Sequence, residues 1–215
     1  MNDAIIIIPT LNEEKYLSRT LESLKNQTVH CETLIVDSNS IDRTLDIAKS
    51  FEASVISAGR GKLTARDVAI RAVKSDVIIS CDADCFYPPR WVENTLAAFK
   101  DGVVGVTGPR YYDTRQEFRD LQSAFYDKCW RLFGSNSAFL RNCYLMSGGF
   151  DLSINQQDSK AMVDEEEVLF RNRLAAFGDV IYQPENPIIT STRRFGFFGK
   201  GDKEFLRSKA AGERF

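Results

Sequence analysis

Two aspartates close an apolar segment of the chain, and their spacing suits the binding of a cation. Residues 77–84 run Val-Ile-Ile-Ser-Cys-Asp-Ala-Asp, so Asp82 and Asp84 lie two positions apart. In an extended strand, side chains two positions apart point to the same face. If the strand continues to its end, both carboxylates enter one small volume, where a cation or a metal–diphosphate complex relieves their repulsion. Aspartate is also common in solvated turns, so the pair alone leaves both interpretations open.

The elements before this pair alternate between predicted strands and predicted helices. Apolar runs predict four strands, at residues 5–8, 32–37, 54–57 and from 77 onward. Apolar residues at helical spacing predict a helix after each of the first three strands, and a capping box at residues 10–13 is expected to open the first helix. Such alternation is typical of right-handed βαβ crossovers and a parallel sheet.

Three of these predicted strands end in polar residues. The groups are Pro9 with Thr10, Asp37 with Ser38, and Asp82 with Asp84. Ligands of open parallel sheets bind beyond the carboxyl ends of the strands, so three polar ends in register predict a nucleotide-sized pocket. The chain has neither GxGxxG after the first strand nor GxxxxGK[ST], which argues against a dinucleotide site and against a P-loop.

The second half of the chain is less regular, and it shows no linker or internal repeat. Helices are predicted from Pro88 to Phe99, at residues 117–133, and from an acidic run at residues 164–167 to Gly178. Strands are predicted at residues 102–108 and 180–182. The pattern predicts one α/β domain over residues 1–215.

Composition limits the partners and the location of the protein. The 215 residues are 43% hydrophobic, enough for one core, and the net charge of −2 gives no general attraction to nucleic acid. Five cysteines without a CxxC spacing and a single histidine argue against a disulfide framework and a zinc site. No apolar run has bilayer length and no basic region precedes the first strand, so we expect neither an anchor nor a signal peptide, and a cytoplasmic location.

Five segments of the sequence carry recognisable motifs. They are Ile-Ile-Pro-Thr-Leu-Asn-Glu-Glu at residues 7–14, Ile-Val-Asp-Ser-Asn-Ser-Ile-Asp-Arg-Thr at 35–44, Ala-Arg-Asp at 65–67, Asp-Ala-Asp at 82–84, and Gly-Gly-Phe-Asp at 148–151 with Arg173 and Gly178 downstream. In this order and spacing they resemble family 2 glycosyltransferases of the GT-A fold over most of the chain. The third segment has Asp67 where the family usually has asparagine.

The resemblance implies a mostly parallel, Rossmann-like sheet flanked by helices, in which residues 1–100 bind a nucleotide sugar and residues 101–215 the acceptor. Asp37 would accept a hydrogen bond from the nucleobase, and Arg66 would lie near the base or the diphosphate. Asp82 would contact ribose and metal, and Asp84 would coordinate the Mg²⁺ or Mn²⁺ that neutralises the leaving diphosphate. The implied nucleotide-sugar-binding residues are Pro9, Thr10, Glu13, Asp37, Arg66, Asp82 and Ala83.

The acidic run at residues 164–167 is the candidate source of a catalytic base. Counting back from Gly178 and Arg173 matches Glu166 and Glu167 to the Glu-Asp pair of the family, which deprotonates the acceptor hydroxyl. A partly desolvated carboxylate beside another acid has a raised pKa, which suits a base. Four consecutive acids leave the choice of carboxylate open, and they also suit the macrodipole at a helix start without any catalysis.

The late segment at residues 190–194 and the tail after it hold the last candidates. Arg193 or Arg194 would clamp the diphosphate or an acceptor phosphate through forked hydrogen bonds, and Gly148 with Gly149 is assigned to the same side of the site. The tail at residues 195–215 mixes phenylalanines with lysines and arginines. Three interpretations stay open for it: contact with an anionic membrane surface, a flap over the site, or a packed terminal helix.

The sequence thus predicts a metal-dependent inverting transferase. It would move a sugar from a UDP- or GDP-sugar to a hydroxyl or phosphate of a glycan, lipid or polyprenyl-phosphate acceptor. One alternative is a sugar nucleotidyltransferase, which the acidic loop at residues 9–14 disfavours because it would repel a triphosphate. The other is a non-catalytic nucleotide-sugar-binding module, which Glu167 keeps open because the family usually has aspartate there.

Overall fold

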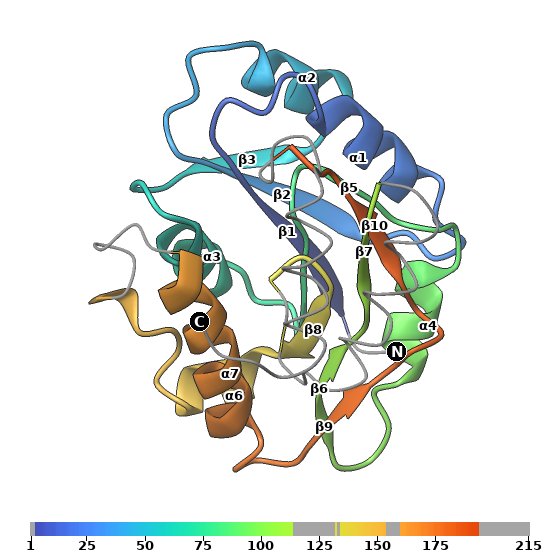
Figure 1. The fold of residues 1–215 in the computed structure, drawn as a ribbon, viewed down its shortest axis with the longest axis vertical. Helices are drawn as coiled ribbons and strands as arrows, with labels where there is room; N and C mark the ends of the chain where they lie inside the picture. Colours follow the sequence, from blue (N-terminus) through green and yellow to red (C-terminus); the bar gives the residue numbers. More distant parts are fainter. Residues whose placement is uncertain (1–2, 114–131, 133, 154–159, 194–215) are drawn as a thin grey trace, which may run out of the picture.

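A seven-stranded sheet lies at the centre of the molecule, with its strands in the order β3-β2-β1-β4-β8-β6-β9. The computed structural model describes residues 3–113, 132, 134–153 and 160–193. Figure 1 shows this sheet between two groups of helices. The strands of the first half are parallel, which confirms the predicted βαβ alternation. They are β1 (Ala4–Thr10), β2 (Glu32–Asp37), β3 (Ser54–Ser57) and β4 (Val77–Ser80).

The other three strands complete a mixed, mostly parallel sheet, as predicted. β8 (Ser137–Leu140) is antiparallel to both its neighbours, β4 and β6 (Val103–Thr107), while β9 (Asp179–Tyr182) pairs in parallel with β6. The predicted helix at residues 117–133, apart from position 132, and the tail at 195–215 lie outside the described residues. Within the described ranges, no helix is long and apolar enough to cross a bilayer.

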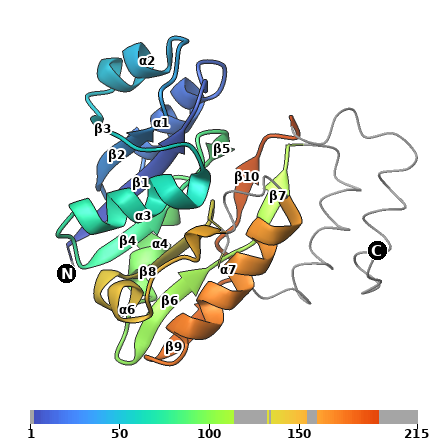
Figure 2. The same cartoon turned by 90° about the vertical axis from the view of Figure 1, so that its left-hand side faces the viewer.

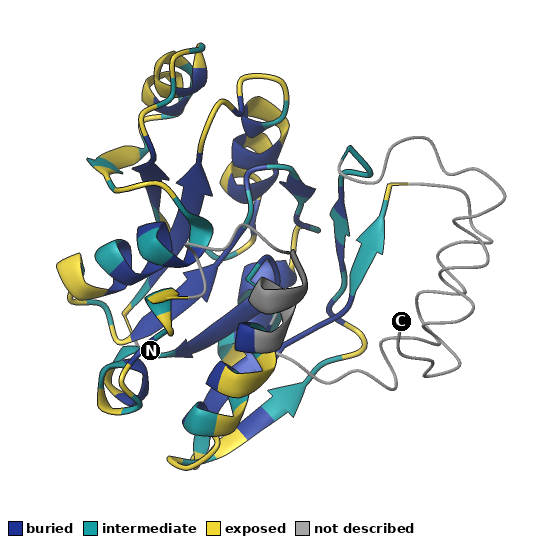
Figure 3. Ribbon diagram, turned by 60° about the vertical axis from the view of Figure 1, so that its left-hand side comes forward, coloured by how far each residue is buried: buried dark blue, intermediate teal, exposed yellow. Residues whose placement is uncertain are grey.

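Alternate side chains of β1 face opposite layers of helices, as the two-residue period of a strand requires. Ile6 and Ile8 pack toward α1, α2 and α4, whereas Ile5 and Ile7 pack toward α3, α6 and α7. Figure 3 shows buried strands between helices whose outer faces are exposed. The helices are α1 (Leu17–Lys25), α2 (Thr44–Ser50), α3 (Lys62–Ala72), α4 (Trp91–Ala97), α6 (Arg141–Met146) and α7 (Lys160–Leu174).

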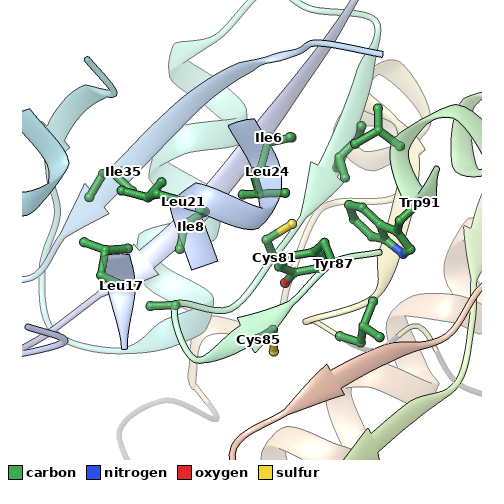
Figure 4. Close-up of a cluster of buried hydrophobic side chains, with 14 of the residues drawn as sticks. Ile6, Ile8, Leu17, Leu21, Leu24, Ile35, Cys81, Cys85, Tyr87 and Trp91 are labelled. Carbon is green, nitrogen blue, oxygen red and sulfur yellow. The ribbon is translucent and has the colours of Figure 1, made fainter. Parts of the chain in front are cut away.

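A stripe of leucines fixes α1 on one face of the sheet. Leu17, Leu21 and Leu24 recur at helical spacing and are buried. Burial of each leucine contributes about 1.5–3 kcal/mol, so the stripe holds the helix firmly. The same cluster, drawn in Figure 4, contains Ile6, Ile8, Ile35, Cys81, Cys85, Tyr87 and Trp91. The residues that follow β4 are therefore anchored in this core.

Small and aromatic residues hold the helices on the other face. Ala65 and Ala69 of α3 are buried, and their small side chains allow a close approach to the sheet. The ring centroids of Phe139 and Phe170 are 5.2 Å apart, and those of Tyr144 and Phe170 are 5.5 Å apart. Both pairs meet edge to face, the arrangement that aromatic rings favour. These contacts position α7, which carries the acidic run.

A second, three-stranded sheet that was not predicted from the sequence stands beside the large one. Its order is β5-β10-β7, with β10 antiparallel to β5 and parallel to β7. Figure 2 shows β10 and β7 extending away from the main sheet. The strands are β5 (Cys85–Phe86), β7 (Arg110–Tyr112) and β10 (Ile188–Thr190). The pairing of Thr190 with Cys85 brings the late segment next to Asp84.

The prediction that a capping box opens the first helix is wrong. Helix α1 begins only at Leu17. The Thr10 hydroxyl instead donates to Asp37 Oδ1 at 3.0 Å, and the Glu13 N–H donates to Thr44 Oγ1 at 2.7 Å. Both groups have partners far along the chain, which a local pattern does not include.

The prediction that the acidic run starts the late helix is also wrong. Helix α7 begins at Lys160, so residues 164–167 lie inside the helix. The macrodipole acts mainly on the first turn of a helix, and the first turn of α7 has no acidic residue. The macrodipole interpretation of the run therefore loses its basis.

Candidate functional site

The carboxyl ends of β1 and β2 bring Thr10 and Asp37 together, as predicted. The two residues are partners in the parallel register, and the Thr10 hydroxyl donates to Asp37 Oδ1. Asp37 also accepts hydrogen bonds from the N–H of Ser40 at 2.9 Å and from its hydroxyl at 2.6 Å. Asp37 is buried, so these donors fix the orientation of its carboxylate at the sheet edge.

The loops after β1 and β2 are joined by hydrogen bonds between their backbones and side chains. Asn12 donates its N–H to Ser40 Oγ and accepts from the Ile41 N–H, both at 2.9 Å. Glu14 donates its N–H to Asp42 Oδ2 at 3.1 Å. Asn12 adopts a φ of 55°, a left-handed conformation that asparagine tolerates better than most residues. The asparagine and glutamate of the first motif therefore rigidify the rim of the predicted pocket.

Asp82 and Asp84 do not lie on a strand, which corrects the geometry predicted for them. Strand β4 ends at Ser80, and the two aspartates lie in the turn that leads into β5. Asp82 Oδ1 accepts from Arg66 at 2.6 Å, and Asp82 Oδ2 contacts Lys62 Nζ at 3.0 Å. Asp84 contacts Arg193 instead. The two carboxylates are thus close in the chain but are compensated by different cations.

Arg66 is the buried centre of the Asp82 side of the site. It also donates to Ser80 Oγ and to the Gly134 carbonyl, each at 2.8 Å. A Cβ added at Gly134 would lie 2.9 Å from the Arg66 guanidinium, so this close approach requires glycine. The sequence analysis missed Lys62 and Gly134. The spacing of Lys62 one helical turn before Arg66 was the available signal for the former, and Gly134 had none.

Arg193 joins Asp84 to the loop after β1. Its Nε donates to Asp84 Oδ2 at 2.8 Å, and its terminal nitrogen donates to Glu13 Oε1 at 2.6 Å. The guanidinium also lies 4.6 Å from the centre of the Tyr16 ring, within cation–π range. The structure therefore brings together Glu13, Asp84 and Arg193, which were predicted separately. Arg194 lies outside the described residues.

Burial and charge act in opposite directions on the pKa values of this group. Burial raises the pKa of the Glu13 carboxyl above its ordinary value, and the hydrogen bond from Arg193 only partly offsets this effect. Burial alone would lower the pKa of Arg193, but its hydrogen bonds to Glu13 and Asp84 raise it above its ordinary value. Arg193 therefore stays charged at every pH at which the protein is folded.

Ala83 is held between the two aspartates by contacts to α1. Its carbonyl and that of Cys85 both accept from the Thr20 hydroxyl at 2.8 Å. The N–H of Asp82 donates to the hydroxyl of Tyr87 at 3.0 Å. A small open pocket lies beside Asp84, between α1 and the small sheet, and Tyr16, Arg19, Asp84, Phe86 and Asp113 contribute to its walls.

Glu166 and Glu167 occupy different environments, although they are adjacent in the chain. Glu166 is fully buried, and its Oε1 accepts from Arg173 and from the Asp151 N–H. Glu167 is half-buried, and its Oε1 accepts from the Gly134 N–H at 2.8 Å. The carbonyl of the same Gly134 accepts from Arg66. Glu167 is therefore the acid that connects to the Asp82 centre, whereas Glu166 is enclosed by protein groups.

Gly148 and Gly149 form a turn beside Glu166. Both have positive φ angles, 86° and 75°, and a Cβ on Gly149 would lie 3.0 Å from the Tyr144 hydroxyl. Tyr144 donates that hydroxyl to Asp67 Oδ1 at 2.7 Å and accepts from the Phe150 N–H. Asp67, the departure from the Ala-Arg-Asn pattern, thus supports this turn.

The oxygen ligands of the site fit a hard divalent ion. Within the described ranges, no group of three or more His, Cys, Asp or Glu side chains is placed to hold a metal ion. Mg²⁺ bound to a nucleotide needs fewer, because one or two carboxylates suffice when phosphate oxygens and water complete its shell. Asp82 and Asp84 supply this donor chemistry, and Glu13 reaches the same guanidinium as Asp84.

Comparisons with known proteins agree with this arrangement. A family model described as glycosyl transferase family 2 matches residues 5–151. Undecaprenyl-phosphate 4-deoxy-4-formamido-L-arabinose transferase of Shewanella sediminis is 27% identical over 135 residues, which cover 57% of this chain and 41% of that protein.

Two solved structures are similar in fold. The mannosyltransferase PcManGT of Pyrobaculum calidifontis, in complex with GDP-Man and Mn²⁺, has a TM-score of 0.70 at 21% identity, covering 91% of this chain and 59% of that one. Glucosyl-3-phosphoglycerate synthase of Mycobacterium tuberculosis, in complex with Mn²⁺, UDP-glucose and phosphoglyceric acid, has a TM-score of 0.64 at 18% identity, covering 98% and 80%.

The match to the transferase from Shewanella spans less than half of that protein's length, and the likeness to the solved structures shows the fold alone. The family model, in contrast, covers most of this chain, including the ends of β1, β2 and β4 and the glycine turn. The chain belongs to glycosyl transferase family 2 and has the GT-A fold.

Proposed function

We propose that this protein is a metal-dependent glycosyltransferase, which moves a sugar from a nucleoside-diphosphate sugar to an acceptor oxygen with inversion. One observation carries the proposal. Asp82, at the carboxyl edge of the sheet, is linked through Arg66 and Gly134 to the helix acid Glu167. One hydrogen-bond network thus holds the residue proposed to bind the donor and the residue proposed as the base. A one-step displacement requires such fixed positions for both.

The first half of the chain would bind the nucleotide. Thr10 and Asp37 lie at neighbouring strand ends, where Asp37 has the oxygens to accept from a base N–H. Lys62 and Arg66, one helical turn apart on α3, would face the diphosphate from the Asp82 side. Asp82 and Asp84 would hold a divalent ion, which supplies neutralisation of the charge that develops on the leaving diphosphate.

Manganese or magnesium is the proposed cofactor. Carboxylate ligands suit both ions, and the two solved structures named above are complexes with Mn²⁺ and a sugar nucleotide. Those relatives carry GDP-Man in one case and UDP-glucose in the other, so both GDP- and UDP-sugars are candidate donors here.

Glu167 is the proposed base. A hydroxyl acceptor must lose its proton as its oxygen attacks the anomeric carbon, and a positioned carboxylate accepts that proton. Glu166 suits this role less well, because its side chain is fully buried and its Oε1 accepts from Arg173 and from the Asp151 N–H. A phosphate acceptor is already ionised at neutral pH and would need no such base.

The acceptor class is proposed as a hydroxyl or phosphate of a glycan, lipid or polyprenyl phosphate. The Shewanella relative is named for undecaprenyl phosphate, and the mycobacterial structure contains phosphoglyceric acid. Both point to phosphorylated acceptors, which Arg193 and Arg194 suit chemically. The single domain over residues 1–215, the cytoplasmic location and membrane contact through residues 195–215 belong to the same proposal.

Nucleotide-dependent thermal stabilisation tests the donor site. We expect UDP, GDP or CDP to raise the melting temperature in the presence of Mn²⁺, since a ligand at about 100 times its Kd stabilises by about 2.7 kcal/mol. Asp84→Asn should abolish this shift, and Asp113→Asn, a pocket-wall residue paired with the exposed Arg19, should keep it. The donor-site proposal fails if no nucleotide stabilises the protein or if Asp84→Asn leaves the shift intact.

A further inference from the structure

Arg193 connects three segments that are distant in the sequence. Its guanidinium contacts Glu13 from the loop after β1 and Asp84 from the turn after β4, while Arg193 itself follows β10. The Ser191 N–H donates to the Asp84 carbonyl at 3.0 Å, so the backbone is tied to the same turn. The side chain of Arg193 is 22% exposed, so it is less enclosed than the two carboxylates that it contacts.

The two carboxylates that Arg193 contacts are nearly buried. Their side chains are 10% exposed for Glu13 and 5% for Asp84, and a buried carboxylate without a cation is strongly unfavourable. The second oxygen of Glu13, Oε2, is buried and has no hydrogen-bond partner among the described residues. A single guanidinium thus leaves this carboxylate pair incompletely satisfied, whereas a divalent ion could take oxygens from both groups.

The balance of charge around Asp82 is the reverse of the balance around Glu13 and Asp84. Asp82 contacts two cations, Lys62 and Arg66, while Glu13 and Asp84 both contact the single guanidinium of Arg193. Positive charge is therefore gathered on the Asp82 side and negative charge on the Glu13–Asp84 side. The first arrangement suits a diphosphate, and the second suits a divalent cation.

We propose that Arg193 is an exchangeable counterion of a cation site formed by Glu13 and Asp84. When a divalent cation binds, Glu13 and Asp84 would hold it in place of the guanidinium, and Arg193 would be released to bind the diphosphate that arrives with the cation. The inference rests on the proposed donor site, and it adds Glu13 to the cation site. Because Arg193 competes with the cation but binds the diphosphate, nucleotide and metal strengthen each other's binding, and this coupling is reciprocal.

Direct measurement of Mn²⁺ binding tests the exchange without any turnover. The amplitude of the free Mn²⁺ signal in electron paramagnetic resonance, or calorimetry, gives the Kd for Mn²⁺ alone and with GDP or UDP. Arg193→Met removes the competing charge and should tighten binding of Mn²⁺ alone by about tenfold, within the usual range of coupling between sites. The matched control is Arg19→Met, because Arg19 lines the same pocket but pairs with Asp113, and it should leave the Kd for Mn²⁺ unchanged.

Two further variants make the experiment decisive. Glu13→Gln in the Arg193→Met background should reverse the gain, because it removes one of the two carboxylates. Arg193→Lys keeps the charge with a single ammonium and should give a Kd between wild type and Arg193→Met, which covers the case in which Arg193→Met does not fold. Melting temperatures of all variants report folding.

The exchange is overturned if Arg193→Met and Arg193→Lys both bind Mn²⁺ alone no more tightly than wild type. It is also overturned if GDP or UDP strengthens Mn²⁺ binding as much in Arg193→Met as in wild type. The proposed function fails separately: in that case no nucleotide binds the wild-type protein, while the comparison of variants with Mn²⁺ alone still decides whether Arg193 shields a cation site.

Discussion

At the scale of residues, Asp82 and Asp84 have unequal roles. A symmetrical pair on a strand would share one cation, but the turn after β4 directs Asp82 to α3 and Asp84 to Arg193. The sequence identified both residues because of their type and their place after a strand. It did not reveal that each aspartate pairs with a different cation, because these cations come from other segments of the chain.

Substitution of the adjacent residues Glu166 and Glu167 should have different effects on activity and on stability. Glu167→Gln should lower turnover by about 10²- to 10⁴-fold with a hydroxyl acceptor and keep nucleotide-dependent stabilisation, because it removes only proton acceptance. Glu166→Gln should instead lower the free energy of unfolding, by about 1–3 kcal/mol, because it weakens the interaction of a fully buried side chain with the partly exposed Arg173. Product formation and urea denaturation separate these outcomes.

Retained turnover in Glu167→Gln would have one of two causes, and the acceptor distinguishes them. With a phosphate acceptor, turnover should be nearly unchanged, since that oxygen needs no deprotonation. With a hydroxyl acceptor, retained turnover would contradict the assignment of Glu167 and direct attention to Asp164 and Glu165. If no acceptor yields product in the wild-type protein while nucleotide still binds, the chain acts as a binding module.

At the scale of elements, the aspartate that follows the two glycines forms a short turn of its own with Ser153. Hydrogen bonds from the Ser153 hydroxyl and N–H, with a smaller contribution from Arg173, lower the pKa of Asp151 below its ordinary value. A lowered pKa in the folded state means that the stabilisation is present above the ordinary pKa and is lost as pH falls through the folded-state value.

Acid unfolding of Ser153→Ala tests this linkage. Without the hydroxyl, the pKa of Asp151 should rise toward its ordinary value, so this carboxylate should contribute less stability at neutral pH, and less stability should be lost on acidification than in wild type. Urea denaturation between pH 2 and pH 6 measures the shift, and Asp151→Asn should remove this part of the pH dependence altogether. Identical pH profiles for wild type and Ser153→Ala would contradict the role of this turn.

The local pattern of the sequence predicted the long elements and missed the short ones, for a physical reason. Strands β2 and β3 have the predicted bounds because a run of apolar, partly β-branched residues specifies each of them locally, although only β2 is largely buried. Strands β5, β7 and β10 have two or three residues, too few to show any periodicity. The failed capping box shows the same limit, since Thr10 prefers a partner 27 positions away.

At the scale of the whole molecule, stability depends on the two cores on either side of the sheet. Leu17→Ala should lower the free energy of unfolding by about 2–5 kcal/mol, because Leu17 is completely buried between α1 and the sheet. Leu45→Ala is the matched control, since Leu45 is 41% exposed and its truncation should change stability by less than about 0.5 kcal/mol. Equal effects in urea denaturation would contradict the described packing.

The resemblance to a family predicted the fold of the whole molecule, which no single motif could predict. Five weak motifs in order predicted the fold that the sheet order and the solved relatives confirm. The site was predicted as a collection of residues, and the structure adds how they are paired. Those pairings involve Lys62, Gly134 and Arg193, whose partners are set by the fold and not by neighbouring sequence.

The place of β10 also has a consequence for biosynthesis. This strand lies between β5 and β7, two segments that leave the ribosome much earlier. The small sheet therefore cannot close until residues 188–190 have emerged, and Asp84 cannot form its ion pair with Arg193 until that residue follows. A nascent chain that carries β1 to β4 thus holds two acidic groups without their counterion, and the last part of the described chain completes the site.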